Sequence, residues 1–240
     1  MKPQSGEMSF LDHLEELRWR IVKIALAVAI CAVPCGIFWK RIFDILMIYP
    51  LRFANPKPQL IFTSPTESVL LSFKIALGGG VIDAIPVVFY QIWRFVAPGL
   101  FPKEKRIVLP TVVASSIAFL CGISFCYFVL PFLLRILTAY AGTRLNPFFK
   151  IDEYFSFLLK LSLAFGVVFE MPVISFVLSR LGILTPKILI RHSRIAIVII
   201  AVIAAVLTPP DIFSMMMLAV PLLALYGLSI LVAYFARRKQ

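Results

Sequence analysis

The sequence predicts an all-α integral membrane protein with six transmembrane helices, the last two of them short, and with both termini in the cytoplasm. Three observations lead to this prediction: the composition, the length of the apolar runs and the distribution of basic residues. Of the 240 residues, 61% are hydrophobic and 15% are charged, and the mean hydropathy is +0.96. Soluble domains are roughly 45–50% apolar and about 25% charged. A soluble fold could not bury this much apolar surface, so most of the chain is expected to face lipid.

The apolar runs give the elements in chain order. The first four are each about 18 residues or longer, which is the length of helix that crosses roughly 30 Å of hydrocarbon. The fifth and sixth are separated by Thr208-Pro209-Pro210-Asp211, where two prolines and a charge break the helix. We therefore expect one membrane domain, residues 1–240, with spans at residues 21–39, 69–93, 107–134, 155–178, 194–207 and 213–235.

The fifth expected span is too short to cross a bilayer of ordinary thickness. At 1.5 Å per residue, residues 194–207 reach only about 20 Å. The backbone at residues 208–211 is therefore expected below the outer membrane surface. There it must lie against protein, in a water-filled recess or in a thinned bilayer.

Two helix starts have capping patterns. Ser9 followed by Asp12 predicts that the first helix begins before the membrane. The string Ser64-Pro65-Thr66-Glu67 has the form of a capping box before the second span. Acidic residues such as Glu15 are untypical of the basic start of a cleavable signal sequence, so the first helix is expected to remain in the mature protein.

The basic residues predict the orientation. Lys and Arg are concentrated in the N-terminal segment, in the loops at residues 94–106 and 180–194, and in the C-terminal tail. Such residues are retained on the cytoplasmic side of a membrane. We therefore expect a multi-pass protein of the cytoplasmic (inner) membrane with both termini in the cytoplasm. The net charge of +12 is explained by this topology, and binding to nucleic acid is the weaker interpretation.

The chain carries no sequence pattern of an enzyme. It contains no phosphate-binding loop, no HExxH and no GxSxG, and it has only two histidines. We expect no catalytic residue, no cofactor and no metal. The cysteines all lie in apolar runs without zinc or redox spacing, so we interpret them as small buried apolar residues. The alternative is a disulfide from Cys31 or Cys35 to Cys126. The run Gly78-Gly79-Gly80 indicates a flexible or closely packed helix segment.

Two acids, Asp83 and Glu170, lie inside expected spans at similar depth. Ionisable groups in a membrane are costly and are functional by default. For Asp83, a hydrogen bond between helices explains the residue as well as a functional role does. Glu170 precedes Pro172, which frees a backbone carbonyl, so we expect a polar, water-accessible bend there. Together the two acids support one functional hypothesis, a proton-coupled secondary transporter of a small solute.

A second hypothesis comes from several strings that occur in one order along the chain. These are HLEELRWR at 13–20, SPTE at 64–67, YQIWRF at 90–95 with AP at 97–98, KEKR at 103–106, FGVVFEMP at 165–172 and TPPD at 208–211. Each string alone is weakly specific. As an ordered set they resemble the TatC family, the polytopic subunit of the twin-arginine protein translocase. The resemblance extends from residue 10 to residue 235 and implies the same six-span topology.

The resemblance implies a receptor rather than an enzyme. Such a receptor binds twin-arginine signal peptides of folded proteins at the cytoplasmic face and organises single-span TatA/TatB-type subunits for export driven by the proton motive force. Self-association within the receptor complex is also implied. The implied signal-peptide residues are Glu16, Glu104, Arg18 and Phe95, with Arg18 holding the surroundings of Glu16.

The chemistry of carboxylates fits these roles. Adjacent guanidinium groups present forked donors that carboxylates accept in pairs, and lysine cannot reproduce this fork. From the residues alone, Glu16 is an i,i+4 partner of Arg20, and Glu104 is a solvated loop charge. The resemblance therefore supplies the functional interpretation of both glutamates.

The resemblance also assigns residues at the other end of the chain. Glu170 matches the intramembrane acid of the family, and Asp211 matches an acid of its last outer loop. Thr208 and Met215 fall at positions of contact with the single-span partners, but the family usually carries glutamine where this chain has Met215. The family usually carries glutamate where this chain has Gly227. Asp83 is an addition to the family pattern.

Overall fold

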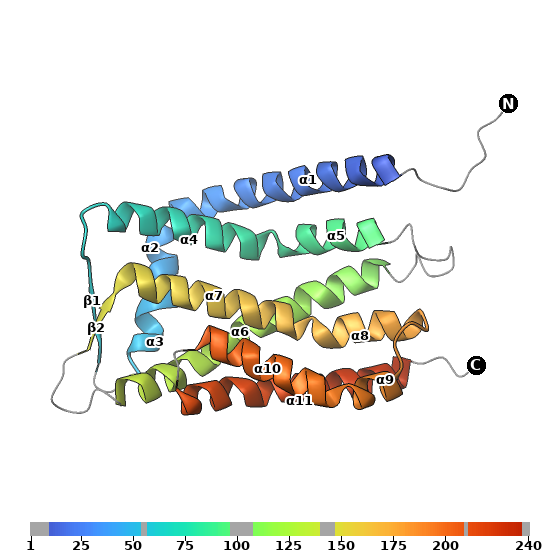
Figure 1. Ribbon diagram of the computed structural model, residues 1–240. Helices are drawn as coiled ribbons and strands as arrows, with labels where there is room; N and C mark the ends of the chain where they lie inside the picture. Colours follow the sequence, from blue (N-terminus) through green and yellow to red (C-terminus); the bar gives the residue numbers. More distant parts are fainter. Residues whose placement is uncertain (1–9, 54–56, 97–107, 140–146, 209–210, 237–240) are drawn as a thin grey trace.

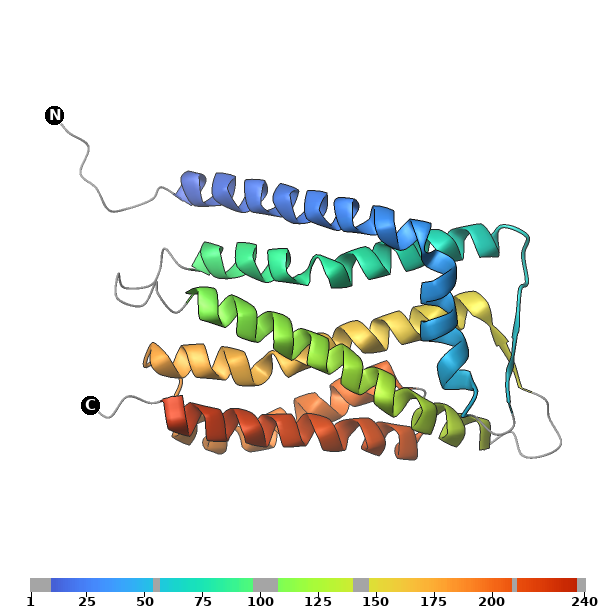
Figure 2. The ribbon, with the colours of Figure 1, turned by 180° about the vertical axis from the view of Figure 1, so that it is seen from behind.

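A computed structural model describes residues 10–53, 57–96, 108–139, 147–208 and 211–236, of which the side chains of residues 10–12 are not described (Figures 1 and 2). The predicted helical fold is confirmed. The longer helices are α1 (Phe10–Ile37), α4 (Glu67–Asp83), α5 (Ile85–Val96), α6 (Val108–Ala139), α7 (Ile151–Phe169), α8 (Met171–Arg180), α10 (Ser193–Leu207) and α11 (Ile212–Ala236). The shorter elements are α2 (Trp39–Phe43), the π-helix η1 (Asp44–Ile48), α3 (Tyr49–Leu51) and α9 (Pro186–Arg191).

Two short strands add to the helices. They are β1 (Gln59–Ile61) and β2 (Phe148–Lys150), and they pair in parallel with Leu60 opposite Phe149. Each strand lies just before a long helix, β1 before α4 and β2 before α7. The pair therefore holds the starts of these two helices side by side, which the sequence analysis did not predict.

The helices have the lengths and composition of membrane spans. Within the described residues, α1, α6, α7 with α8, and α11 are long and apolar enough to cross a membrane, and α4 with α5 make a fifth candidate that is bent by 52°. The helix α10 is apolar but has only 15 residues. Five of the six expected spans therefore have helices of sufficient length among the described residues, the second of them bent, whereas α10 at the expected fifth span is shorter than a membrane-crossing helix.

The two bent or interrupted spans have a common cause. The break that separates α4 from α5 lies at Ala84, two residues before Pro86. The break that separates α7 from α8 lies at Glu170, two residues before Pro172. Proline lacks the amide hydrogen that a helix interior requires, and its ring clashes with the carbonyl four residues earlier. The expected spans 69–93 and 155–178 are therefore each two helices.

The helices form an ordered row. The helix α1 packs on α4 and α5, α5 packs on α6, α6 on α7, α8 on α11, and α11 on α10. Helix α1 begins and α11 ends at the same end of the molecule, which we call the terminal end (Figure 1). The two strands and α3 lie at the opposite end, which we call the strand end (Figure 2). The predicted placement of both chain ends on one side agrees with this arrangement.

Glycines allow two helix pairs to approach closely. A Cβ on Gly80 of α4 would lie 2.8 Å from the backbone of Ala32 in α1, and one on Gly79 would lie 2.8 Å from Cys35 Sγ. Where α6 meets α7, a Cβ on Gly122 would lie 2.6 Å from the Phe165 carbonyl oxygen. Small residues at such contacts are typical of helix packing in membranes. Of the two interpretations of the glycine run, close packing is therefore confirmed.

Glu67 ties the strand end together. One of its oxygens, Oε2, accepts hydrogen bonds from the amides of Thr63 and Ser64, at 2.7 and 3.3 Å, and from the Thr63 hydroxyl at 3.1 Å. Its other oxygen, Oε1, accepts from the amide of Asp152 at 3.2 Å. The carboxylate therefore joins the turn after β1 to the first turn of α7. The expected capping box forms only in part, because the Ser64 hydroxyl contacts Thr66 and not the Glu67 amide.

The cysteines depart from one expectation. All four are free, so the disulfide alternative is wrong. Cys35 and Cys126 are buried as predicted, but Cys121 is exposed because it lies on the outward side of α6. The Cys35 thiol donates to Asp83 Oδ2 at 3.2 Å. This contact is the hydrogen bond between helices that the sequence suggested for Asp83. Ser9, the expected N-cap of α1, lies outside the described residues.

The packing predicts the effect of a single added methyl group. Gly80→Ala places a Cβ against the Ala32 backbone, which cannot move without displacing α1, and should lower the free energy of unfolding by about 1–3 kcal/mol. The matched control is Gly227→Ala in α11, where a Cβ meets nothing within 4 Å. Thermal unfolding of the purified protein in detergent measures both variants. Equal midpoints for the two variants would contradict the close α1–α4 contact.

Candidate functional site

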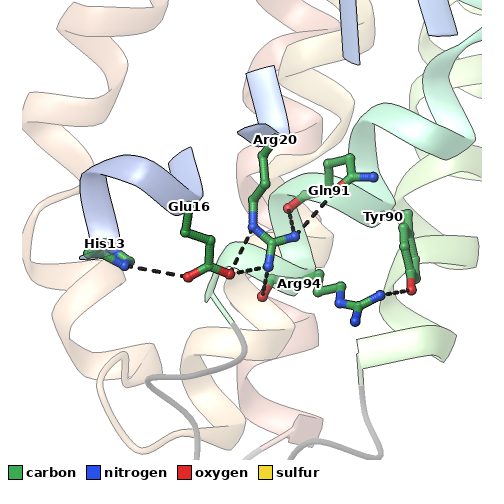
Figure 3. A network of polar contacts seen from close by, with 6 residues as sticks. All are labelled: His13, Glu16, Arg20, Tyr90, Gln91 and Arg94. Carbon is green, nitrogen blue, oxygen red and sulfur yellow. Dashed lines mark hydrogen bonds and ion pairs between the residues drawn. The ribbon is translucent and has the colours of Figure 1, made fainter. Parts of the chain in front are cut away.

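A polar network joins α1 to α5 at the terminal end (Figure 3). Glu16 and Arg20 are four residues apart in α1, so they share one face of the helix. Glu16 Oε1 accepts hydrogen bonds from Arg20 Nε, at 3.1 Å, and from Arg20 Nη2. The same guanidinium donates from Nη1 to the side-chain oxygen of Gln91 at 3.2 Å and from Nη2 to the carbonyl of Arg94 at 3.2 Å. Arg20 therefore links an acid of one helix to the end of the next.

The positive charge of Arg20 lies at the C-terminal end of α5. The last four carbonyls of a helix have no partner within it, and the helix dipole is negative there. The Arg94 carbonyl is one of these four in α5, which ends at Val96. The Arg20 side chain is only 12% exposed, whereas that of Glu16 is 24% exposed. The Arg20 side chain is thus the more enclosed of the two, and the Glu16 side chain is the more exposed.

The second oxygen of Glu16 is the unusual feature of the network. Glu16 Oε2 is buried and accepts no hydrogen bond from the described residues. The His13 Nδ1 lies 3.9 Å from Glu16 Oε2. The His13 ring in turn stacks on Phe95 with centroids 4.3 Å apart. The carboxylate therefore has one oxygen held by Arg20 and one buried oxygen that accepts no hydrogen bond from the described residues, beside the His13–Phe95 stack.

Arg94 is turned away from this carboxylate. Its Nη1 donates to the Tyr90 hydroxyl at 2.6 Å, and its guanidinium lies 5.6 Å from the centre of the same ring. Figure 3 shows the Arg94 side chain directed to the opposite side of α5 from Glu16. Arg94 therefore contributes a backbone carbonyl to the network and not its charge.

The expected role of Arg18 requires a correction. Arg18 pairs with Glu15 at 3.5 Å, and both side chains are largely exposed, at 72% and 57%. Residues two apart in a helix do not face each other, and in this structure Arg18 pairs with Glu15 and not with Glu16. Arg20 takes this place, as the simple i,i+4 interpretation of the residues indicated. Glu104, the second expected acid, lies outside the described residues.

A second polar group lies in the middle of the helices. Glu170, at the break between α7 and α8, is 5% exposed, and its Oε1 has no hydrogen-bond partner among the described residues. The hydroxyl of Ser115 in α6 is a hydrogen-bonding neighbour of this carboxyl. Ser115 also accepts a hydrogen bond from Trp93 Nε1 in α5 at 3.0 Å. Three elements thus bring polar groups together inside an apolar fold.

From the sequence, Gln91 and Trp93 were named only as members of the string YQIWRF, and Ser115 was not named. Gln91 carries a signal that could have been used, because it is an amide in an otherwise apolar helix segment. Ser115 and Trp93 carry none, since both residue types are ordinary in membrane helices. The two intramembrane acids do not share contacts. Asp83 contacts α1 through Cys35, and Glu170 contacts α6.

A third group of polar residues lies where α10 ends and α11 begins, on the side of these helices that faces the strand end. Asp211 Oδ1 accepts from the Ser214 amide at 2.7 Å, which caps the first turn of α11. The Thr208 hydroxyl donates to the Ala204 carbonyl at 2.8 Å. Met215 is half-buried against the core. Asp211 Oδ2 and Ser214 Oγ are buried without a hydrogen-bond partner in the described part of the chain.

Metal binding has no support in the described residues. Across the described ranges, no three residues of the His, Cys, Asp and Glu types come together as metal ligands. The polar groups of the three regions are carboxylates, hydroxyls and guanidinium groups. Their arrangement favours recognition of charged or hydrogen-bonding partners.

The network at the terminal end predicts unequal effects of two neighbouring arginines. Arg20→Gln removes the contacts to Glu16 and to the end of α5, and should lower the free energy of unfolding by about 2 kcal/mol. Arg18→Gln removes one exposed ion pair and should change it by less than about 0.5 kcal/mol. Thermal unfolding in detergent at low and high salt distinguishes them. Similar losses in both variants would contradict the position of Arg20.

Comparisons with known proteins agree on one family. The family model described as Sec-independent protein translocase protein (TatC) matches residues 12–221. TatC of Aquifex aeolicus is 40% identical over 236 residues, which cover 97% of this chain and 98% of that protein. TatC of Helicobacter pylori strain J99 is 37% identical and covers 92% of this chain and 87% of that protein. TatCy of Bacillus subtilis is 38% identical and covers 98% and 92% of the two chains.

Solved structures resemble the fold over almost its whole length. A crystal structure of the twin arginine translocase receptor TatC matches with a TM-score of 0.82 at 40% identity, and covers 93% of this chain and 99% of that chain. A crystal structure of the same receptor in DDM matches with a TM-score of 0.83 at 40% identity, and covers 92% and 99%.

Proposed function

The chain belongs to the TatC family of Sec-independent protein translocase proteins, and from this premise we propose that its terminal end binds the twin-arginine signal peptides of folded proteins. Members of this family are multi-pass membrane proteins of a protein translocase, and they are not enzymes. In the cell, the terminal end faces the cytoplasm and the protein lies in the inner membrane, as its basic residues predict.

The buried, unpaired oxygen of Glu16 supports this proposal best. An arginine side chain offers five N–H donors on a flat guanidinium, so one of them can donate to a single carboxylate oxygen while the plane packs on a ring. In Glu16, one oxygen already accepts from Arg20 and Oε2 accepts from nothing described. An incoming guanidinium donates to Oε2 and lies beside the stacked rings of His13 and Phe95, where an arginine plane also packs well.

The same geometry explains a preference for arginine over lysine. The carboxylate is partly removed from water, so a donor that fits poorly leaves a desolvated charge unpaired. Lysine presents a compact, strongly hydrated ammonium group and loses more hydration for fewer directed contacts. Arg20 cancels the charge of Glu16, so two arginines need a second acid. We assign that role to Glu104, in the segment that follows α5.

Partner subunits are assigned to the strand end of α10 and α11. The short helix α10 carries an exposed apolar face that includes Ile195, Val198 and Val206. Beside it, Asp211 Oδ2 and Ser214 Oγ are buried polar atoms without a partner. A single-span TatA/TatB-type helix with one polar side chain would cover the face and supply the missing hydrogen bonds. Met215 in place of glutamine makes this contact more apolar than is usual in the family.

The transporter hypothesis has less support. It requires Asp83 and Glu170 to act as one proton relay, but their contacts lead to different helices. Asp83 also has a structural partner in Cys35. Glu170 is better explained as the intramembrane acid of a translocase driven by the proton motive force.

Peptide binding tests the receptor assignment. A labelled twin-arginine signal peptide should bind the purified protein at least about tenfold more tightly than its twin-lysine counterpart, since one lost directed pair costs roughly 1.4 kcal/mol or more. Glu16→Gln and Glu104→Gln should each remove most of this preference. Fluorescence anisotropy in detergent measures the affinities.

Glu15→Gln is the matched control for this experiment. Glu15 carries the same charge one position away, but it is exposed and paired with Arg18. It should keep the arginine preference within about twofold. An equal loss in Glu15→Gln would show that overall charge, and not the directed carboxylate of Glu16, attracts the peptide. Equal binding of both peptides to the unaltered protein would refute the receptor assignment.

Export in cells tests Glu170. Glu170→Gln keeps the size and a hydrogen-bonding end but cannot ionise, so transport of a folded reporter with a twin-arginine signal should fall at least about tenfold. Peptide binding should stay unchanged, because Glu170 precedes the end of α8 at Arg180 by ten residues, or about 15 Å of helix. Glu153→Gln, an exposed acid of α7, serves as the control. Full export by Glu170→Gln would exclude a role for its charge.

A further inference from the structure

A pocket lies against α6 on the strand-end half of the molecule. Its volume is about 450 Å³, which is within the range of roughly 300–1,000 Å³ that is usual for small-molecule sites. Aromatic side chains of α6 and of the α3 region supply most of its lining, namely Tyr49, Phe53, Tyr127, Phe128 and Phe132. None of these residues belongs to the signal-peptide site at the terminal end.

The aromatic walls are held in place by one another. The Tyr49 and Tyr127 rings stack with centroids 6.0 Å apart, and Tyr49 meets Phe53 edge-on at 5.3 Å. The Tyr127 hydroxyl donates to the carbonyl of Ile45. The chain from η1 to α3 is therefore fastened to α6, and the pocket is a built feature of the fold.

One charged side chain lines the pocket. Arg135, in the last turns of α6, is exposed and forms no ion pair within the described residues. Arginine binds phosphate through two parallel hydrogen bonds, and an uncompensated arginine at a membrane surface attracts an anion. The charge of the pocket thus complements a phosphate group.

The length of the pocket matches one leaflet of a bilayer. Ser124 and Arg135 both line it, and α6 rises by about 16 Å between them at 1.5 Å per residue. Half of a hydrocarbon core of roughly 30 Å is about 15 Å. A chain that starts at Arg135 and follows α6 toward Ser124 would therefore end near the middle of the membrane.

We propose that this pocket binds one phospholipid of the outer leaflet, with the phosphate on Arg135 and one acyl chain along the aromatic rings toward Ser124. Aromatic side chains are typical of the boundary between headgroups and hydrocarbon. A bound lipid stabilises the contact between the α3 region and α6, because it binds the folded state and not the unfolded one. The site is independent of the signal-peptide site.

A transmembrane helix fits this pocket less well than a lipid. Helices associate in membranes through small residues that allow close approach of the backbones. Here the lining is made of large rings, and Phe128 and Phe132 are 67% and 51% exposed. A flexible acyl chain can fill the space between such rings, whereas a rigid helix would rest on top of them.

Lipid binding to the delipidated full-length protein tests the proposal. Native mass spectrometry in detergent follows titration with a phosphatidylglycerol, with the diacylglycerol of the same chains, and with inorganic phosphate alone. The protein should bind one phosphatidylglycerol at least about tenfold more tightly than the diacylglycerol and should not bind phosphate alone. Arg135→Gln should weaken the phospholipid at least about tenfold and leave the diacylglycerol unchanged.

Two further variants complete the experiment. Ser124→Phe fills the far end of the pocket and should weaken both lipids about tenfold. Arg41→Gln changes an exposed arginine of α2 outside the pocket and should have no effect. Equal binding of the two lipids, or equal effects of Arg135→Gln and Arg41→Gln, would overturn the proposal. If the unaltered protein formed a dimer that Arg135→Gln and Ser124→Phe both abolished, the proposal would be overturned, and the pocket would instead bind a second copy of this chain.

Discussion

In hydrocarbon an unpaired backbone amide or carbonyl costs several kcal/mol, and this constraint governs the whole molecule. It restricts the spans to helices. At each break in a helix, backbone amides and carbonyls lose their helical hydrogen bonds and need other partners. The breaks at Ala84 and Glu170 are caused by Pro86 and Pro172. Around the second break, Ser115 and Trp93 bring polar groups to Glu170. The polar interior of this protein is thus a consequence of where its helices are interrupted.

The same requirement positions the terminal end. The α5 carbonyls need donors, and Arg20 of α1 supplies them while it holds Glu16. This joins the capping of one helix to the orientation of an acid on another. Arg20 thus fixes the orientation of the Glu16 carboxylate before any ligand binds, which lowers the cost of ordering in the binding that we propose. A residue with a structural role thus orients the acid to which we assign the receptor role.

The two ends of the molecule differ in the chemistry that they present. The terminal end presents a partly enclosed carboxylate and aromatic rings, which suit a basic peptide in water. The strand end presents Glu67, which ties two helix starts together, and the aromatic pocket beside Arg135, which suits a lipid. Helix α6 runs between these ends (Figure 2). Its length allows one helix to contribute both Ser115 to the intramembrane group and Arg135 to the pocket in which we propose a lipid.

The helices, the common side of the chain ends and the pairing of Glu16 with Arg20 could all be predicted from the sequence, because they depend on local periodicity and on residues four apart. The partners of distant residues could not. Gln91 is 71 residues from Arg20 and Asp152 is 85 residues from Glu67. Likewise, the i,i+4 spacing indicated Arg20 as the neighbour of Glu16, but only the packed helices show that Arg20 also reaches Gln91 and the Arg94 carbonyl of α5. Local spacing determines which face of a helix a residue occupies, whereas packing between helices determines what that face meets.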